Sequence, residues 1–338
     1  MDARSRDLLL CLGHGSQRTV DDAYRERSTD RSPEERTMST SAVVVGVDGS
    51  SSTRAAVRWA ADAALSRHAP LLIVSAALLT PGTFTDGINL RVGVFGEQRS
   101  EAHRALDSAV AVARESTSGR SLDVHTAFEH GAAAEVLVGY SDHAQLVVVG
   151  SRRLGEISGV MYGSVGVHVA AHARCPVVIV KTSSPDGPSP DGPIVVGVDG
   201  SSASEAAIRW AFDESSRRST DLVAVHAWTD VDAGAAAVRS GAYPSDDNLS
   251  RAEDSVLAES LAGFSEHYPD VHVRREVFRD NPVRELLRES ADAQMVVTGT
   301  RGRGGFTALM LGSTSRALIH RAAVPVVVVP PHRSTSRP

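Results

Sequence analysis

A glycine-rich segment at residues 299–315 carries the residue types best suited to binding phosphate. It follows an apolar run that predicts a buried strand, and it leads into a predicted helix. Glycines let backbone N–H groups approach a ligand closely, and a helix N-terminus offers N–H donors and a partial positive charge. Hydroxyl side chains at its end add further donors. The candidate phosphate-binding residues are Gly299, Gly302, Gly312, Ser313, Thr314 and Ser315.

A less regular version of this segment occupies residues 150–166. Arg153 stands where the second glycine is expected, and Gly166 stands where the later segment has Ser315. The Arg153 side chain either obstructs the backbone or supplies charge to a phosphate, and both alternatives stay open. We therefore expect two unequal sites, with the later one binding more tightly. The earlier candidates are Gly150, Gly163 and Ser164.

The remaining polar residues do not predict catalysis. The two cysteines, Cys11 and Cys175, have no CxxC partner, which makes a disulfide framework or structural zinc site improbable. The histidines show no HExxH pattern, and we expect those at 125, 143, 168 and 172 to be surface or hydrogen-bonded core residues. No nucleophile, base and acid come together in the pattern. We expect no catalytic residue, no resident metal and no enzyme, with slow hydrolysis at most a side activity.

The chain repeats itself at an offset near 150 residues. Residues 43–51 return as 194–202, and Arg58-Trp59-Ala60 returns as Arg209-Trp210-Ala211. A period of this length indicates a duplicated domain. The expected organisation is a disordered extension at 1–40, a first domain at 41–181, a linker at 182–192 and a second domain at 193–331. Met38, just before the first repeat, is an alternative start.

Each copy alternates short apolar runs with amphipathic stretches, which predicts a parallel sheet with helices on both faces. Ligands in such folds bind beyond the carboxyl ends of the strands. A capping box at Ser202–Glu205 and an Asn281-Pro282 start predict two helix N-termini. We expect Trp59 and Trp210 in the core. The expected strands are 42–47, 71–77, 122–128, 146–149, 177–180, 194–198, 222–227, 271–278, 295–298 and 326–329, and the long helices are 53–67, 97–116 and 249–266.

Bulk properties narrow the partners. The 338 residues carry a net charge of −6, without the basic excess that nucleic-acid binding usually needs. No apolar run approaches the roughly 20 residues of a membrane span. We therefore expect a cytoplasmic protein that contacts neither nucleic acid nor membrane.

These motifs together resemble the universal stress protein family. Its nucleotide-binding members share Gly-x2-Gly-x9-Gly-Ser/Thr, which Gly299, Gly302, Gly312 and Ser313 match in full. The opening Gly-Val-Asp-Gly-Ser and the closing Pro-Val-Val-Val-Val are also similar to the family, and the resemblance covers residues 42–181 and 193–330.

The resemblance implies two Rossmann-like domains of the adenine nucleotide alpha hydrolase-like type, each a five-stranded parallel sheet of order 3-2-1-4-5. It implies bound ATP, accompanied by Mg²⁺, with Asp48 and Asp199 at the adenosine end. From the residues alone, both aspartates are equally explained by turn formation or helix capping. The implied role is a stress response that works through nucleotide-dependent conformation or partner binding.

Two other functions compete with this one. The first is a nucleotide-free dimerisation or interaction module of the same fold. The second, an ATP pyrophosphatase or nucleotidyl transferase, needs a Ser-Gly-Gly-x-Asp-Ser loop that neither copy supplies. Each copy also ends in an apolar strand that would be an exposed edge if unpaired. We therefore expect the two copies to pair within the chain, with homodimerisation as a further option.

Overall fold

The computed structural model describes residues 42–78, 91–151, 164–181, 191–229, 246–302 and 311–331, with backbone alone at 51, 91–98, 246 and 247. The predictions for the extension 1–40, for most of the linker 182–192, and for Arg153 and Gly163 fall outside these residues.

The first half alternates strands and helices as its sequence pattern predicts. Its elements are β1 (Val43–Val47), α3 (Ser51–Ser66), β2 (Leu71–Ala77), α4 (Arg91–Ser116), β3 (Val124–His130), α5 (Ala133–Tyr140), β4 (Leu146–Ser151), α6 (Ser164–His172) and β5 (Val177–Lys181). The strands β1, β4 and β5 are almost entirely buried, whereas the edge strand β3 is partly exposed.

Over its described residues, the second half repeats this succession, with the short helix α10 (Phe264–His267) in addition. Its elements are β6 (Ile194–Gly197), α7 (Ser202–Arg218), β7 (Leu222–Ala227), α9 (Asp246–Leu261), α10 (Phe264–His267), β8 (Val273–Phe278), α11 (Pro282–Glu289), β9 (Met295–Gly299), α12 (Ser313–Arg321) and β10 (Val326–Val329).

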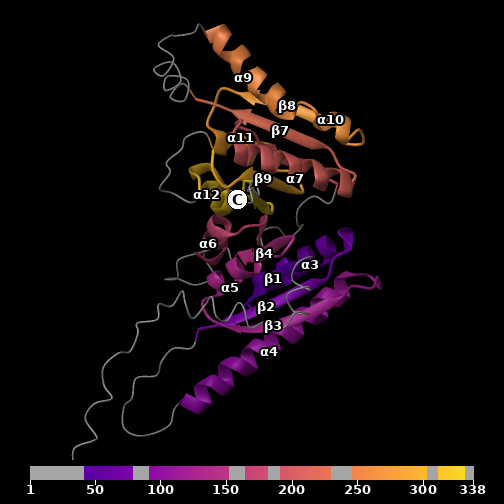
Figure 1. Cartoon of the computed structure of the whole chain (residues 1–338), viewed down its shortest axis with the longest axis vertical. Coiled ribbons are helices and arrows are strands. Elements are labelled where there is room, and N and C mark those ends of the chain that lie inside the picture. The colour runs from indigo at the N-terminus through magenta and orange to yellow at the C-terminus, as the bar shows by residue number, and fades with distance from the viewer. Residues whose placement is uncertain are drawn as a thin grey trace, which may run out of the picture. The chain divides into compact units, whose positions relative to one another are not determined.

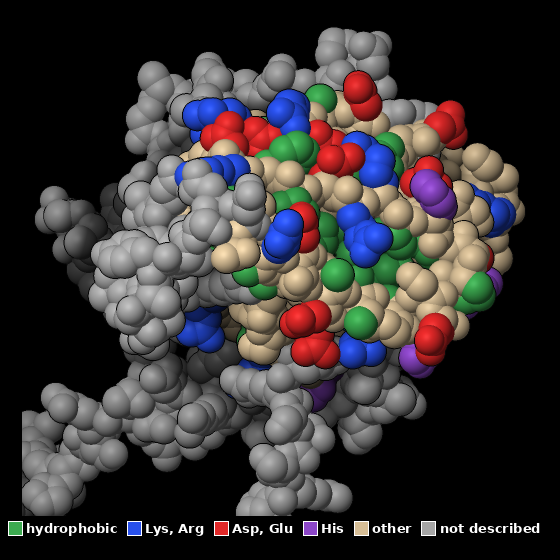
Figure 2. Space-filling view, turned by 90° about the horizontal axis from the view of Figure 1, so that it is seen from above, with side chains coloured by type: hydrophobic (Ala, Val, Ile, Leu, Met, Phe, Trp, Pro, Cys, Tyr) green, Lys and Arg blue, Asp and Glu red, His purple; other side chains and the backbone are tan. Residues whose placement is uncertain are grey.

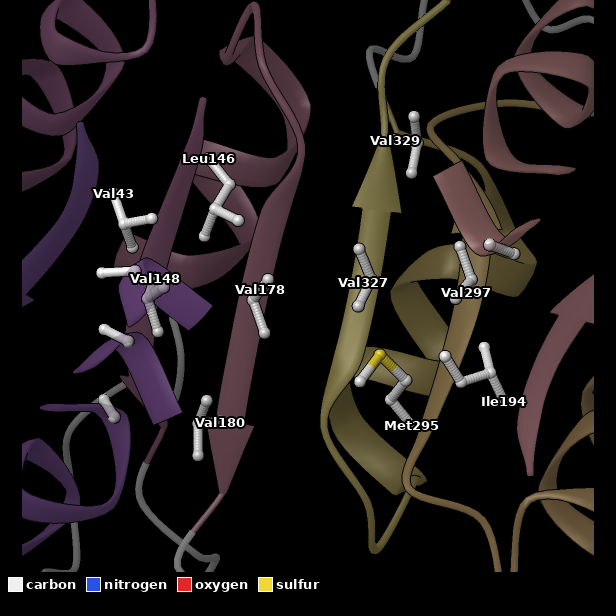
Figure 3. Packing of buried hydrophobic residues seen from close by; sticks show 14 of the residues in the cluster. Val43, Leu146, Val148, Val178, Val180, Ile194, Met295, Val297, Val327 and Val329 are labelled. Carbon is white, nitrogen blue, oxygen red and sulfur yellow. The ribbon is translucent and has the colours of Figure 1, made fainter. Parts of the chain in front are cut away.

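All ten strands form one sheet of order β3-β2-β1-β4-β5-β10-β9-β6-β7-β8. Within each half the pairs are parallel, and the order is the 3-2-1-4-5 that the resemblance implies. The halves meet where β5 and β10 run antiparallel, with Val178 opposite Val327 (Figure 3). This pairing joins the β5 edge of the first half to the β10 edge of the second half, and both edges would otherwise be unpaired.

Alternate residues of each strand enter two hydrophobic clusters on opposite faces of the sheet. Val43 and Val45 face the cluster under α3 and α4, whereas Val44 faces the cluster under α5 and α6. The second half is layered in the same way by α7 and α9 on one face and α11 and α12 on the other (Figure 1). Each fully buried valine contributes roughly 1.5–3 kcal/mol. Figure 3 shows side chains of the cluster that contains Val43, including Met295 and Ile194 from the second half.

The local boundaries differ from the sequence prediction at two helices. The cap of α7 is Ser201, not Ser202, because the Ser201 hydroxyl oxygen accepts from the N–H of Ser204 (3.2 Å). The predicted helix 249–266 is interrupted by Gly263, whose φ of +80° belongs to the left-handed region that favours glycine. The Asn281 cap of α11 is as predicted.

A buried carboxylate links the two halves. Glu214 on α7 is fully buried and pairs with Arg67 at the end of α3 (2.6 Å) and with its own helix neighbours Arg217 (3.1 Å) and Arg218 (2.5 Å). Burial alone would raise the pKa of Glu214, but Arg218 and Arg67 hold this pKa below its usual value. The ion pair thus joins helices that lie 147 residues apart in sequence.

Trp59 and Trp210 lie at this junction and are only half-buried, so the prediction that they belong to the core holds in part. Arg218 lies 5.5 Å from the ring centroid of Trp59, and Arg67 lies 5.9 Å from that of Trp210. An arginine over an aromatic face is an attractive arrangement. Lys181, the chain's one lysine, donates across the same junction to the Ala322 carbonyl that ends α12 (2.8 Å).

Among the described residues, no helix has the length and apolar character that crossing a lipid bilayer requires.

Candidate functional site

The turn after β6 places Asp199 at the carboxyl edge of the second half. The Val198 N–H donates to the Val225 carbonyl on β7 (2.8 Å). Asp199 then accepts from the Ser201 N–H through Oδ1 (3.0 Å), and its own N–H donates to the Ser204 hydroxyl (3.1 Å). Asp199 therefore forms a turn that starts α7, as the simpler of the two sequence interpretations requires.

Gly302, the second glycine of the motif, lies directly against Asp199. A Cβ added to Gly302 would fall on Oδ2 of the Asp199 carboxylate. Gly302 is exposed and Asp199 is half-buried, so the two residues meet at the surface of the site. A side chain at this position would have to displace the carboxylate. The structure thus brings together two predicted site residues that are about a hundred positions apart.

Gly299, the first glycine of the motif, has a packing role. It is buried, and a Cβ there would lie 2.7 Å from the carbonyl carbon of Ala203 and 2.8 Å from its oxygen. Gly150 occupies the same position in the first half, where a Cβ would lie 2.8 Å from the Ser52 carbonyl oxygen. Both glycines let the end of the fourth strand of each half approach the first turn of that half's first helix.

The predicted phosphate-binding hydroxyls lie in the first turn of α12. Gly312 is its N-cap residue and donates its N–H to the Thr300 carbonyl (2.7 Å). Ser313 is exposed and Thr314 is half-buried. The first turn of a helix also presents N–H groups without intrahelical acceptors, and these attract anions.

Ser315 stands apart from the other two hydroxyls. It is buried, and its hydroxyl donates to the Gly299 carbonyl oxygen (2.7 Å). Its proton is therefore engaged inside the fold, where it ties α12 to the end of β9. In the first half, Gly166 takes this place without a hydroxyl and is likewise buried.

The first half retains part of the arrangement. Asp48 is exposed, and its Oδ1 accepts from the Ser50 N–H and from the Thr53 hydroxyl, both at 3.0 Å. Ser164 is exposed at the start of α6. Gly163 and Arg153 lie outside the described residues, so the comparison between the two halves covers only the two ends of this segment.

Sequence reasoning missed one pair beside the Asp199 turn. His226 on β7 lies with Nδ1 2.7 Å from the Val198 carbonyl oxygen and Nε2 2.7 Å from Oε2 of Glu253 on α9. The signal was available, because a histidine inside the apolar run 222–227 must find polar partners when that strand is buried.

Metal and thiol chemistry find little support in the part of the chain that the structure describes. No three His, Cys, Asp or Glu side chains gather there in a way that would hold a metal ion. Cys175 is buried, as predicted, and its burial raises the pKa of the thiol to about 12. A thiol in that state is a poor nucleophile at neutral pH.

The comparisons with known proteins agree with the motif. The model described as "Universal stress protein family" matches residues 40–181 and again 192–330. Universal stress protein Rv2623 of Mycobacterium tuberculosis is 41% identical over 291 residues, which cover 85% of this chain and 95% of that protein. Universal stress protein Rv2005c of the same species is 39% identical over 290 residues, covering 85% and 96%.

A solved structure matches the fold over most of the chain. The universal stress protein from Archaeoglobus fulgidus DSM 4304 superposes with a TM-score of 0.61 at 20% identity, covering 86% of this chain and 98% of that one. At this identity the likeness supports the architecture alone. The two family matches, the relatives near 40% identity and the tandem parallel sheets lead to one conclusion: this chain belongs to the universal stress protein family.

Proposed function

We propose that the chain binds ATP at the carboxyl edge of its second half and acts in a stress response through nucleotide-dependent conformation or partner binding. The observation that carries the proposal is the close approach of Gly302 to the Asp199 carboxylate, in a loop whose residues Thr300 and Arg301 also lie beside Gly312, the N-cap of α12. Family membership supplies the nucleotide class, because the complete Gly-x2-Gly-x9-Gly-Ser spacing is that of its nucleotide-binding members.

The residues fit the two ends of such a ligand. The N–H groups and hydroxyls of Ser313 and Thr314 suit phosphate oxygens at a helix N-terminus. The Asp199 carboxylate suits the hydroxyl or amino donors of adenosine. Mg²⁺ would arrive with the phosphates and neutralise part of their charge. The role of this chain's residues is binding, and we propose no catalytic group.

Calorimetric titration of the full chain with Mg·ATP tests the proposal. Replacing Gly312 by Val adds bulk beside the Thr300 carbonyl and Arg301, where the α12 N-terminus meets the motif. We expect this variant to lose the tighter binding event, whereas Gly163→Val should affect the weaker event in the first half. Unchanged affinity in Gly312→Val would show that the motif does not hold phosphate. Native mass spectrometry of the purified chain identifies any nucleotide that it carries from the cell.

The two halves are proposed to bind unequally. The first half has Arg153 in place of the second glycine, and Gly166 in place of Ser315, whose hydroxyl supports the start of α12 from inside the fold instead of donating to the ligand. Loss of one hydrogen bond to a charged group weakens affinity by about ten- to a hundredfold. Equal affinities for the two events would show that Arg153 acts as a ligand instead of an obstruction.

We further propose that the boundaries at 41–181 and 193–331 enclose two domains that stay paired through β5 and β10 in solution. A cytoplasmic location is compatible with the unpaired thiol of Cys175. If no nucleotide binds under any condition, the alternative role as an interaction module of the same fold replaces ATP binding.

A further inference from the structure

A hydrogen-bonded pair of side chains, His226 and Glu253, holds the peptide that carries Asp199. His226 and Glu253 have side chains that are 3% and 15% exposed, and their Nε2 and Oε2 atoms are 2.7 Å apart. The other ring nitrogen, Nδ1, is 2.7 Å from the Val198 carbonyl oxygen. That carbonyl belongs to the same planar peptide unit as the Asp199 N–H, which donates to the Ser204 hydroxyl. The peptide is therefore fixed at both of its polar groups.

Both ring nitrogens of His226 face acceptors. A carbonyl oxygen has no proton to give, so Nδ1 must carry hydrogen. The contact between Nε2 and Glu253 then also needs a proton, placed on the ring or on the carboxyl group. Removing that proton would leave two lone pairs facing each other at 2.7 Å. The arrangement is thus complete only with the pair in its protonated form.

Of the charged side chains that the structure describes, those around the pair come from α7, α9, β8 and the end of β6. Strand alternation places His226 on the face that bears α7 and α9, together with Leu222 and Ala224. On α9 the next charged residue is the exposed Asp254, and on β8 it is Arg275, which together line a groove with Leu257 and Val277. Figure 2 shows charges of both signs mixed with hydrophobic side chains over this end of the second half.

Two elements complete these surroundings. On α7, Glu205 and Arg209 pair with each other at 3.5 Å and are about half exposed. On the β6 side the charged neighbour is Asp199 itself, engaged by Ser201. Glu253 is therefore the carboxylate that the ring of His226 contacts directly.

The first half lacks this pair. β1 and β2 match β6 and β7 at an offset of 151 residues, so Ser75 stands in place of His226. The same offset aligns Leu106 with Leu257, both in the core, and puts Ala102 in place of Glu253. The matching serine and alanine are natural choices for replacing the pair.

We propose that His226 and Glu253 are positioning residues whose shared proton orients Asp199, so that ATP affinity of the second half falls as pH rises. The inference rests on the proposed ATP site. When the shared proton leaves, one of two hydrogen bonds is lost. Either His226 no longer donates to the Val198 carbonyl, or the contact between His226 on β7 and Glu253 on α9 is no longer a hydrogen bond. In both cases the Asp199 carboxylate moves relative to Gly302 and the start of α12.

The test is calorimetric titration of the full chain with Mg·ATP at a series of pH values on both sides of neutrality. The Gly163→Val background confines binding to the second half. We expect the affinity to fall about tenfold across this range, the effect of losing one charge-assisted hydrogen bond. His226→Ser and Glu253→Ala should bind weakly with a flat profile, and any slope left in them reports titration of the nucleotide itself.

Two further variants separate positioning from a general structural role. Glu253→Asp keeps the carboxylate and should retain the pH slope, whereas Asp254→Ala, one residue along α9, should match the parent protein. A slope in Glu253→Ala equal to that of the parent would overturn the proposal.

A readout without nucleotide keeps this inference separate from the proposed function. In the ¹⁵N imidazole NMR spectrum of the unliganded chain, His226 should show two protonated nitrogens at low pH, and the Asp199 amide signal should shift in step when the proton leaves. A static Asp199 amide across the titration contradicts positioning. If ATP binds at no pH, the proposed function fails and the coupling to ATP fails with it, while the NMR titration still decides whether the pair orients Asp199.

Discussion

Single atoms decide what each glycine of the motif contributes. Gly299 is required by the backbone of α7, since a Cβ would lie within 2.8 Å of Ala203 atoms, whereas Gly302 is required by the carboxylate of Asp199. The glycine at position 299 is therefore needed for internal packing, whereas the glycine at position 302 is needed at the candidate site. Both are glycines because a methyl group has no room, although the neighbour that excludes it differs.

Gly299→Ala should lower stability, and Gly302→Ala should lower ATP affinity. The first change overpacks a buried strand end, which typically costs about 1–3 kcal/mol. The second displaces the Asp199 carboxylate at an exposed position and should leave the free energy of unfolding within about 0.5 kcal/mol of the parent protein. Denaturant unfolding and calorimetry on both variants check this division. Equal loss of stability in the two variants would refute it.

Ser315→Ala should destabilise the second half by about 1 kcal/mol, because the Gly299 carbonyl loses a buried hydroxyl donor. Ser313→Ala, in the same turn but exposed, is the matched control and should unfold like the parent protein. Urea unfolding distinguishes the two. If Ser313→Ala and Ser315→Ala both leave the free energy of unfolding unchanged, the hydrogen bond between α12 and β9 does not contribute to stability.

At this scale, sequence reasoning selected candidate residues but not the contacts that each one makes. The glycine spacing made Gly302 a candidate and the family resemblance made Asp199 one, and the structure places these two side by side. Ser315 was expected to face phosphate, yet its proton goes to the Gly299 carbonyl. His226 was missed, since its partner Glu253 lies 27 residues away on a helix and only folding brings them together.

At the scale of elements, the caps determine where helices begin. Asn281 caps α11 by accepting from the N–H groups of Val283 (3.0 Å) and Arg284 (3.3 Å). The equivalent helix of the first half, α5, begins at Ala133, and its N-cap residue, Ala132, has no side chain that could accept a hydrogen bond. The two halves thus differ in how firmly the same helix is started.

Asn281→Ala should cost about 0.5–2 kcal/mol, the usual range for losing a side-chain cap. The reverse change, Ala132→Asn, should stabilise the first half, because the backbone there is already extended as a cap requires (φ −67°, ψ 127°). Thermal unfolding of the two variants should show shifts of opposite sign. Shifts of the same sign would mean that the side-chain cap does not determine the thermal stability at these two helices.

The strands were predictable from sequence to within two residues, because continuous Val-rich runs suit a sheet covered on both faces. Helix ends were less so. Two neighbouring serines, Ser201 and Ser202, both qualify as a cap, and only the turn set by Asp199 selects the first. Gly263 broke a predicted helix because its left-handed backbone cannot continue one.

At the scale of the whole molecule, Glu214→Ala should be the most destabilising change considered. It leaves Arg67, 6% exposed, without its carboxylate partner, and breaking a buried pair in this way costs about 3–5 kcal/mol. Glu205→Ala on the same helix removes an exposed pair with Arg209 and should cost under about 0.5 kcal/mol. Denaturant unfolding of the full chain compares them, and similar costs would rule out a structural role for the buried pair.

The same residue predicts how acid acts on the chain. The pKa of Glu214 is lower in the folded protein than its ordinary value, so its contribution is present above that ordinary value and is lost as pH falls through the lowered one. Stability should therefore decline on acidification more steeply in the parent protein than in Glu214→Gln. Parallel acid titrations followed by circular dichroism check the sign, and identical curves would contradict it.

The repeat predicted two domains and a paired edge, and β5 and β10 are that pair. The chemistry of the junction was not predictable, because Arg67 and Glu214 are ordinary charged helix residues until α3 and α7 meet. A hydrophobic pattern specifies which strands are buried, whereas an ion pair between distant helices depends on their final separation.

Glu214 has an implication for the origin of the tandem arrangement. Its counterpart in the first half is Ala63, so one carboxylate serves Arg67 from the first copy and Arg218 from the second. Two identical subunits would carry such a glutamate twice or not at all, and two buried carboxylates side by side would repel. Gene fusion removes that constraint, because each copy can then acquire a residue that its twin does not share. The covalent link thus allows an asymmetric contact that a symmetric dimer of either half cannot form.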